Sequence, residues 1–367
     1  MNKIKEYNDI LAFHPGYYVN EIIEDMEMTQ KEFAKRLGTT EKTLSKLVNG
    51  EIRLSNEIAN KLSLMTGISI ETWLNLQSTY DIKCLEIDTA QNTSEEIPIM
   101  KVIDYSYFQN LGLVKATKNP QEKVSSLCQC LEVASLTNLK SNNLVANFRS
   151  SRSEIKEHNI INANAWLSIA TRFAKDKQVN AFNKDKLLSY INEIRSMTLQ
   201  PPSIFIPRLN QIFTECGVSF ILLPTLKNSN INGAVKWITP NKVILAINDR
   251  NKYADIFWFS MFHEIRHVLQ MKLKTILIDG TNNICELDET LEKDADNFAT
   301  NTLIPIDKYT KFIRSNSFIS QEKVEQFAKD IGIHAGIVVG RLHHDSILPN
   351  SHLNHLRERY KISITIK

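Results

Sequence analysis

The sequence predicts a multidomain chain in which an all-α N-terminal domain and a helical middle region precede an α+β C-terminal domain. With 367 residues, the chain is longer than a single hydrophobic core usually supports. Residues 15 to about 77 read as short helices separated by cap and turn residues. After Pro201 and Pro202 the apolar pattern changes from helical to strand-like, and helices follow again. These observations place the main change of architecture near residue 201.

The composition is that of an ordinary globular protein, with 43% hydrophobic and 23% charged residues. No apolar run approaches the length that crosses a bilayer, and the first residues lack the apolar core of a signal peptide. The five cysteines include no CxxC pair, which favours reduced thiols. We therefore expect a cytoplasmic protein without a membrane partner. The net charge of +3 is too small to indicate nucleic-acid binding over the whole surface.

Helix-start and helix-stop residues outline the all-α domain over residues 1–80. Thr29 and Glu32 form a capping-box pattern, and the helix that begins there stops before Gly38. Further helices are predicted over residues 40–48, 55–66 and 70–76. Each of the first two begins with a Thr or Ser cap and ends at a glycine-containing stop.

Three stretches of this domain resemble the Xre-type helix-turn-helix of HigA-like antitoxins, over roughly residues 12–78. They are FHPGYYVNEIIEDMEMTQKEFAKRLG, TTEKTLSKLVNGEIRLS and ETWLNLQ. In such a domain, the second helix of the motif enters the major groove of double-stranded operator DNA. The residues that we expect to face the bases are Thr40, Lys42, Thr43 and Lys46. Gln30, at the start of the preceding helix, is expected to contact a phosphate.

The local charge of the motif favours DNA binding. Between residues 29 and 53, six Lys and Arg residues stand against three Glu residues, a local excess of +3. Because such domains mostly bind palindromic sites as dimers, we expect a homodimer. The alternative is a small helical domain used only for protein contacts.

The region between the two terminal domains carries no pattern that indicates chemistry. Residues 81–98 lose the helical periodicity and become polar, which predicts a linker. Residues 99–200 are mainly helical in pattern, with an apolar stripe that includes Trp166, Ala170 and Phe173. We expect this connecting region to pack beneath the C-terminal domain, residues 201–367.

The C-terminal domain begins with strands. Residues 217–224 read as one strand, and residues 233–238 and 242–247 read as a hairpin. We expect 242–247 to be the edge strand, which could hold an extended peptide by main-chain hydrogen bonds. An ordinary structural hairpin is the alternative. A long apolar helix is predicted from Ala254 to about Met271, and another over residues 291–303.

The long apolar helix carries an HExxH pattern in His263, Glu264 and His267. Residues four apart project from the same helix face, so the two imidazoles can bind one metal ion. A third, carboxylate ligand leaves a fourth tetrahedral position for water on Zn²⁺, which lowers the pKa of that water to about 7. Glu264 can then take the proton and pass it to a leaving amine. The alternative is a chance match, but burying these groups without a shared partner is costly.

A later helix supplies the third ligand. Glu292 and Asp296 share a helix face, so Glu292 can bind the metal while Asp296 hydrogen-bonds a ligand imidazole. Glu286, Glu289 and Asp294 are less favoured as ligands. If the segment that contains Glu292 and Asp296 is considered alone, the alternative is that its acidic residues form the solvent-exposed start of a helix and bind no metal.

From about residue 200 onward the chain resembles the ImmA/IrrE family of bacterial metallopeptidases. The resemblance is carried by GAVKWI, IFWFSMFHEIRHVL, EKDADNFATNTLIP and GIHAGIVVGRLHHD. It implies a minimal zincin-like metallopeptidase fold that cleaves a regulatory partner protein, with His263, His267 and Glu292 binding zinc and Glu264 acting as base. One residue departs from the family pattern: Arg266 stands where the family usually has glycine, which puts the activity in doubt more than the metal binding.

The leading hypothesis is therefore a DNA-binding regulator, antitoxin-like at its N-terminus, fused to a zinc-dependent endopeptidase that cleaves a regulatory partner protein. The main alternative is a non-enzymatic repressor or antitoxin whose C-terminal domain binds a toxin or a ligand. A general protease without DNA binding is a third possibility, which the helix-turn-helix disfavours.

Overall fold

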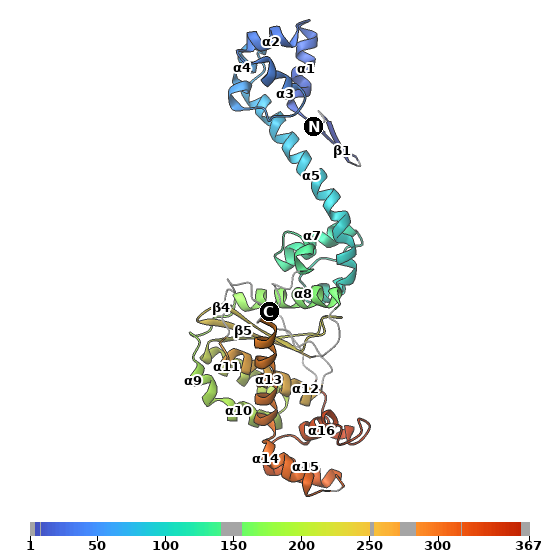
Figure 1. Cartoon of the computed structure of the whole chain (residues 1–367), viewed down its shortest axis with the longest axis vertical. Coiled ribbons are helices and arrows are strands. Elements are labelled where there is room, and N and C mark those ends of the chain that lie inside the picture. The colour runs from blue at the N-terminus through green and yellow to red at the C-terminus, as the bar shows by residue number, and fades with distance from the viewer. Residues whose placement is uncertain are drawn as a thin grey trace. The chain divides into compact units, whose positions relative to one another are not determined.

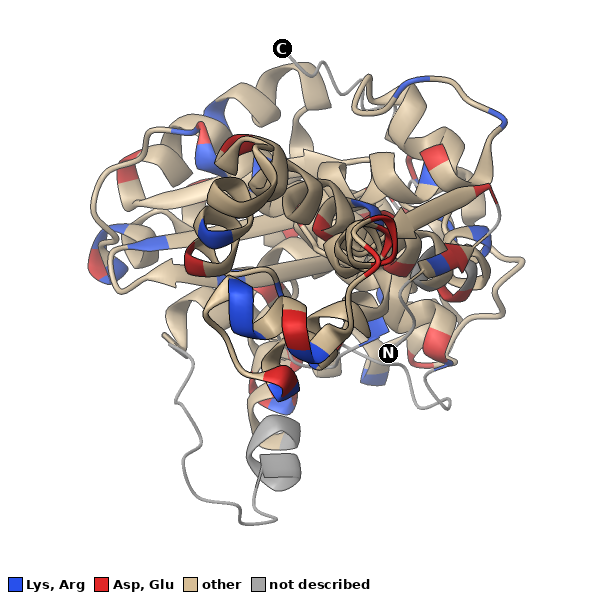
Figure 2. Ribbon diagram, turned by 90° about the horizontal axis from the view of Figure 1, so that it is seen from above, with Lys and Arg blue, Asp and Glu red and all other residues tan. Residues whose placement is uncertain are grey.

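The computed structural model describes residues 4–7, 9–140, 156–249, 253–271, 284–316 and 318–360. The chain forms two compact units, Met1–Pro98 and Ile99–Lys367 (Figure 1). Lys and Arg are interspersed with Asp and Glu along the ribbon (Figure 2). Among the described residues, no helix has both the length and the apolar character needed to cross a membrane.

The first unit is a helical domain preceded by a short hairpin. The hairpin pairs β1 (Ile4–Tyr7) with β2 (Ile10–Phe13) in antiparallel fashion and was not predicted. The helices are α1 (Pro15–Asp25), α2 (Gln30–Leu37), α3 (Glu41–Val48), α4 (Asn56–Thr66) and α5 (Ile70–Val102). The predicted helix starts are confirmed, because Thr29, Thr40 and Ser55 each accept a hydrogen bond from a backbone N–H in the first turn.

Apolar side chains from α1 to α5 form the core of this unit. Phe33 of α2 and Leu44 and Leu47 of α3 are fully buried, and Trp73 of α5 packs in the same cluster. Gly38 ends α2 in the left-handed conformation, with φ of 66°, which lets the chain turn tightly into α3. The core therefore fixes the two helices of the motif relative to each other.

Residues 81–98, which the sequence predicted as a linker, belong to the helix α5. The segment is polar because most of its surface is exposed: Ile87 is fully buried, whereas Leu85 is 66% exposed. Polar side chains also stabilise the helix locally, as in the pair between Lys83 and Glu86 at 2.7 Å. The boundary between the two units falls after Pro98, at the end of the predicted linker.

The helices between residues 99 and 200 share one compact unit with the sheet that follows, so the structure joins the two parts that the sequence separated at residue 201. They are α6 (Tyr105–Asn110), α7 (Pro120–Leu131), η1 (Leu136–Lys140), α8 (Glu157–Lys175), α9 (Lys184–Ser189), α10 (Ile191–Ser196) and η3 (Met197–Leu199). Helix α8 lies against β3 and β5. The indole of Trp166 on α8 donates a hydrogen bond to the carbonyl of Pro224 at 2.9 Å, which ties α8 to the end of β3.

The sheet has three strands in the order β3-β5-β4, namely β3 (Val218–Leu223), β4 (Gly233–Thr239) and β5 (Lys242–Asn248). The predicted hairpin of β4 and β5 is confirmed, but the predicted edge strand is wrong. Strand β5 lies in the middle because it also pairs with β3 in parallel. The two edges are β3 and β4, and the last residues of β4 are exposed whereas those of β5 are buried.

The remaining helices complete the second unit. They are α11 (Pro202–Cys216), α12 (Ala254–Leu269), α13 (Ile284–Leu303), α14 (Ile306–Arg314), α15 (Gln321–Ile331), α16 (Ala335–His344) and η4 (Asn354–Leu356). Helix α12 packs on β4 and β5, and α13 and α16 pack on α12 (Figure 1). The long apolar helix predicted from Ala254 is thus confirmed, and it lies between the sheet and α13.

Candidate metal centre and nucleic-acid interface

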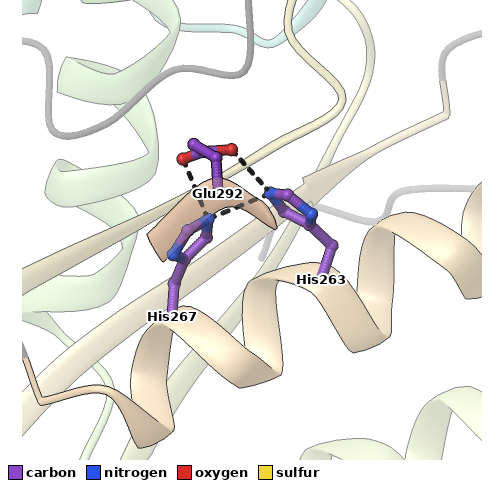
Figure 3. Close-up of side chains that lie close together, drawn as sticks. All are labelled: His263, His267 and Glu292. Atoms are coloured by element: carbon purple, nitrogen blue, oxygen red, sulfur yellow. Dashed lines mark hydrogen bonds and ion pairs between the residues drawn. The ribbon is translucent and has the colours of Figure 1, made fainter. Parts of the chain in front are cut away.

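Helices α12 and α13 bring three predicted ligands together (Figure 3). His263 and His267 are one turn apart on α12 and are almost completely buried, and Glu292 comes from α13. The two Nε2 atoms lie 2.9 Å apart. The Nε2 atom of His263 is 3.3 Å from one carboxylate oxygen of Glu292, and that of His267 is 3.2 Å from the other. One potential ligand atom from each residue therefore lies within 4.8 Å of the other two, a spacing that could hold one metal ion.

The second nitrogen of each imidazole is also held. The Nδ1 atom of His263 lies 3.0 Å from a carboxylate oxygen of Asp296, the partner that the sequence predicted. The Nδ1 atom of His267 lies 2.9 Å from the side-chain oxygen of Gln270, which was not predicted. Both partner oxygens are acceptors, so both Nδ1 atoms carry hydrogen. With both Nδ1 atoms held in this way, each Nε2 is directed at the shared point, where a bound metal ion would take the place of the Nε2 proton.

The cluster also changes the proton affinities of its members. Burial lowers the pKa of His263, but hydrogen bonds with Asp296 and Glu292 outweigh burial and raise that pKa to about 9. Burial raises the pKa of Glu292, but hydrogen bonds from the two histidines outweigh it and lower the pKa to about 2. Glu292 is therefore ionised at neutral pH, and its negative charge favours a cation at the shared point.

Glu264 lies beside this point but belongs to a different face of α12. Its side chain is buried against Gly233, the first residue of β4: a Cβ atom on Gly233 would come within 2.7 Å of the Cγ of Glu264. A cavity of about 20 Å³ is lined by Glu264, His263 and Ser260, together with the segment from Ile231 to Gly233. That volume accommodates about one water molecule. The carboxylate can therefore exchange a proton with a water next to His263.

Arg266, the residue that departs from the ImmA/IrrE pattern, is held by α13. Its guanidinium donates two hydrogen bonds to Asp294, at 2.7 and 3.1 Å, and lies over the ring of Phe298. None of these three residues lines the small cavity at Glu264. Arg266 is therefore paired with α13 and does not line the cavity beside Glu264.

Asp294 connects Arg266 to the histidine pair. The amide nitrogen of Gln270 donates to Asp294 at 2.8 Å and to the carbonyl of Leu291 at 3.0 Å, while its oxygen accepts from His267. The sequence analysis did not favour Asp294 as a metal ligand. Asp294 instead holds Gln270, which in turn holds the candidate ligand His267. One signal in the sequence could have indicated the role of Gln270, since this residue follows His267 by three positions and shares its helix face.

Three further histidines are not members of the ligand cluster. His334 caps α16 by accepting from the N–H of Gly336. The Nε2 atom of His343 donates to the carbonyl of His352 at 2.8 Å, and His344 is exposed beside Asp345. Their hydrogen bonds serve the packing around α16.

In the first unit, α2 and α3 form a helix-turn-helix. Thr40 caps α3, and its hydroxyl lies 2.8 Å from the hydroxyl of Thr43. Lys42 and Lys46 are exposed one turn apart on α3, on the side opposite its buried residues. Gln30 is half-buried at the first position of α2. The five predicted DNA-contacting residues therefore lie at the starts of α2 and α3 and on the outer face of α3.

The basic side chains around the motif differ in whether they already form ion pairs. Arg36 forms an ion pair with Glu32 at 2.7 Å, and Arg53 forms one with Asp81. Among the residues that the structure describes, Lys42 and Lys46 form no ion pair. These two ammonium groups are therefore available to phosphates without breaking an existing contact.

The first unit has counterparts among known proteins. A family model described as helix-turn-helix matches residues 19–73. YddM, an uncharacterised HTH-type transcriptional regulator of Escherichia coli K12, is 34% identical over 68 residues, covering 18% of this chain and 72% of the relative. Antitoxin HigA-1 of Vibrio cholerae is 33% identical over 90 residues, covering 24% of this chain and 81% of the relative.

A solved structure of a HigA-family addiction module antidote protein from Coxiella burnetii is 28% identical, covering 23% of this chain and 92% of its own chain, with a TM-score of 0.22. The matched region of YddM is most of that protein but less than a fifth of the present chain. The similarity therefore concerns the DNA-binding part. Through its N-terminal unit, the chain belongs to the helix-turn-helix family of DNA-binding transcriptional regulators.

Proposed function

We propose that the chain is a transcriptional regulator whose second unit is a zinc-dependent endopeptidase that cleaves a regulatory partner protein. The observation that carries this proposal is the convergence of two buried imidazoles and one ionised carboxylate on a single point, beside a water-sized cavity that Glu264 lines. Two histidines and a carboxylate are a common ligand set of catalytic zinc.

The donor set fits zinc on chemical grounds. Both imidazoles direct Nε2 to the shared point, because Asp296 and Gln270 hold the Nδ1 atoms. The Glu292 carboxylate supplies one negative charge in a partly buried place. When bound, zinc would lower the pKa of a coordinated water and polarise a peptide carbonyl.

Glu264 is the residue that would move protons in this site. It is not one of the three clustered ligands, and Gly233 leaves room for its side chain next to the cavity. The carboxylate can accept a proton from the attacking water and deliver it to the amide nitrogen of the leaving peptide. His263 and His267 keep their orientation throughout, because their Nδ1 partners come from the protein.

A single substitution tests the enzymatic part. The wild-type chain and the Glu264→Gln variant are each purified with zinc and incubated with the proteins encoded next to the gene, which serve as candidate partners. We expect the wild type to cut one of them and the variant to leave it intact, with equal zinc content in both. Cleavage that survives Glu264→Gln, or a wild type that retains no zinc, would refute the proposal.

For the first unit, we propose double-stranded operator DNA as the ligand and a homodimer as the binding form. Thr40, Lys42, Thr43 and Lys46 would face the major groove, and Gln30 would contact the backbone. The exposed lysines of α3 and the capped start of this helix support that assignment.

A second candidate function deserves a test because one relative is itself named an antitoxin. In this alternative the second unit binds a toxin or a ligand without cleaving it, and any metal has a structural role. Glu264→Gln would then leave repression of a reporter gene and toxin neutralisation unchanged. His267→Ala, which removes a ligand, would disturb both if the metal holds the unit together.

A further inference from the structure

The residue directly before β4, Asn232, borders the small cavity at Glu264. Ile231, Asn232 and Gly233 line this cavity from the segment that leads into β4, and of these three Asn232 alone carries a polar side chain. The other lining residues come from α12. Asn232 and Glu264 therefore border the same water-sized space from two different elements of the fold.

Two hydrogen bonds from Asn248 fix the backbone at Asn232. The N–H of Asn248, the last residue of β5, donates to the carbonyl of Asn232 at 3.0 Å. The side-chain amide of Asn248 donates to the preceding carbonyl, that of Ile231, at 2.6 Å. On the other side of Asn232, Gly233 packs against Glu264. The position of Asn232 is therefore set without a bond from its own side chain.

The side-chain oxygen of Asn232 lacks a donor. This Oδ1 atom is buried and accepts no hydrogen bond from the residues that the structure describes. A buried amide oxygen has given up its hydrogen bonds to water, so leaving it without a donor costs folding free energy. Asn248 differs, because its amide nitrogen holds a carbonyl of the chain. The acceptor at Asn232 is suited to a donor that arrives with a ligand.

The proposed reaction brings one such donor to this space. Glu264 must reach the nitrogen of the cleaved peptide bond to protonate it, and that nitrogen carries an N–H group. A hydrogen bond from this N–H to Asn232 would leave the opposite side of the nitrogen to Glu264. The bond strengthens as the nitrogen gains a proton, because charge-assisted hydrogen bonds are stronger than neutral ones. It therefore favours the transition state over the bound substrate.

We propose that Asn232 is a catalytic residue, whose Oδ1 atom accepts a hydrogen bond from the nitrogen of the leaving amine. This inference rests on the proposed peptidase function. In the step, the water oxygen bonds to the carbonyl carbon and the C–N bond breaks. Glu264 passes to the nitrogen the proton that it took from the water, and the other water proton stays on the new carboxyl group. The amine keeps its own N–H on Asn232, which is unchanged.

The first test needs neither zinc nor cleavage. Asn232→Leu replaces an unpaired buried amide by an apolar group of similar size, so the second unit should unfold at an equal or higher denaturant concentration than in the wild type. The matched control is Asn248→Leu, which removes a hydrogen bond from a buried asparagine and should lower that concentration. Hydrogen exchange of peptides from β3, in the full chain, follows the transition. A lower unfolding concentration for Asn232→Leu would indicate a structural bond and overturn the proposal.

The second test compares an amide with an ester. The probes are the peptide that the wild type cuts fastest in a degenerate library, and the depsipeptide in which oxygen replaces the nitrogen of the cut bond. The ester has no N–H to donate, so Asn232→Leu should lower kcat about 10- to 100-fold on the peptide and about twofold or less on the depsipeptide. The KM for the peptide and the zinc affinity should each change by about twofold or less, because Asn232 is not one of the clustered ligands and acts mainly in the transition state.

The outcomes separate this inference from the proposed function. An equal loss of kcat on the peptide and the depsipeptide, unchanged cleavage of the peptide, or a loss of zinc affinity in Asn232→Leu would overturn the role of Asn232 while the peptidase stands. A zinc-loaded wild type that cuts no peptide of the library would overturn the proposed function, and the role of Asn232 with it.

Discussion

Arg266 and Asp294 join α12 to α13 through two hydrogen bonds, of 2.7 and 3.1 Å, and Asp294 accepts a third from Gln270. Because Gln270 in turn holds His267, the pair between Arg266 and Asp294 supports a candidate ligand. An arginine in place of the glycine of the ImmA/IrrE pattern is therefore compatible with metal binding.

The first prediction concerns this support. Gln270→Leu keeps the size of the side chain but removes the acceptor for the Nδ1–H of His267, so we expect zinc affinity to fall about 10- to 100-fold. Gln270→Glu retains an acceptor and should restore most of the affinity. Competition with a chromogenic chelator measures both. The control is Gln326→Leu, which removes a surface hydrogen bond to Asp330 and should leave zinc affinity unchanged.

The second prediction concerns the contact between β4 and Glu264. Gly233→Ala places a methyl group 2.7 Å from the Cγ of Glu264, so the carboxylate must move. We expect cleavage to fall at least tenfold and stability to fall by about 1–3 kcal/mol, with zinc content unchanged. Peptide cleavage, chemical unfolding and metal analysis provide the three readouts. Full activity in a variant with unchanged stability would show that this close packing is not required.

The spacing of residues along a helix explains which parts of the candidate metal site could be predicted from the sequence. His263 and His267 lie on one helix, so their common direction follows from their spacing alone. Glu292 and Asp296 were inferred from the same spacing on a second helix. The role of Gln270 was not predicted, because it depends on Asp294 and Leu291 from the other helix. Gly233 was noted only as part of a motif, since its contact with Glu264 joins residues distant in sequence.

The same distinction, between contacts local in sequence and contacts between distant residues, explains which parts of the fold could be predicted. Helix starts at Thr29, Thr40 and Ser55 were predicted correctly because caps act within four residues. The edge strand was predicted wrongly because the position of β5 depends on its pairing with β3, some 20 residues earlier in the chain. The helical conformation of residues 81–98 was not predicted, because an exposed helix has few apolar residues to reveal its period.

The third prediction concerns DNA binding by α3. Lys46→Ala removes an exposed ammonium group, so the slope of log affinity against log salt should decrease in magnitude by about 1 on a random-sequence duplex. Fluorescence anisotropy of the full chain, recorded at salt concentrations from about 50 to about 200 mM, measures this slope. Lys83→Ala on α5 is the control, and it should leave the slope unchanged. Equal slopes for the two variants would remove Lys46 from the interface.

The fourth prediction is a pH dependence centred on His14. This residue caps α1 by accepting from the N–H of Gly16 and packs on the ring of Tyr80. Burial lowers its pKa below the ordinary value of about 6.5, against a hydrogen bond to the backbone of Ile52 and the charge of Asp81. Its contribution to stability is therefore present above pH 6.5 and is lost as the pH falls below that value.

Hydrogen exchange of peptides from α1 and α3, in the full chain, tests this dependence. After correction for intrinsic rates, we expect protection to decrease between about pH 6.5 and pH 5, by at most about 1.4 kcal/mol per pH unit. His14→Asn keeps a capping acceptor that does not titrate and should flatten the dependence. A variant with the wild-type pH profile would exclude His14 as its origin.

The placement of the ligands on two helices has a consequence for how the second unit unfolds. A metal bound by His267 and Glu292 would close a loop of roughly 25 residues, and a cross-link of that span removes about 3.5 kcal/mol of chain entropy from the unfolded state. The lifetime of the second unit would then follow the zinc supply of the cell, because unfolding must release the ion. A regulator built in this way would lose its second unit to proteases during zinc starvation, while its DNA-binding unit, which contains none of the ligands, would persist.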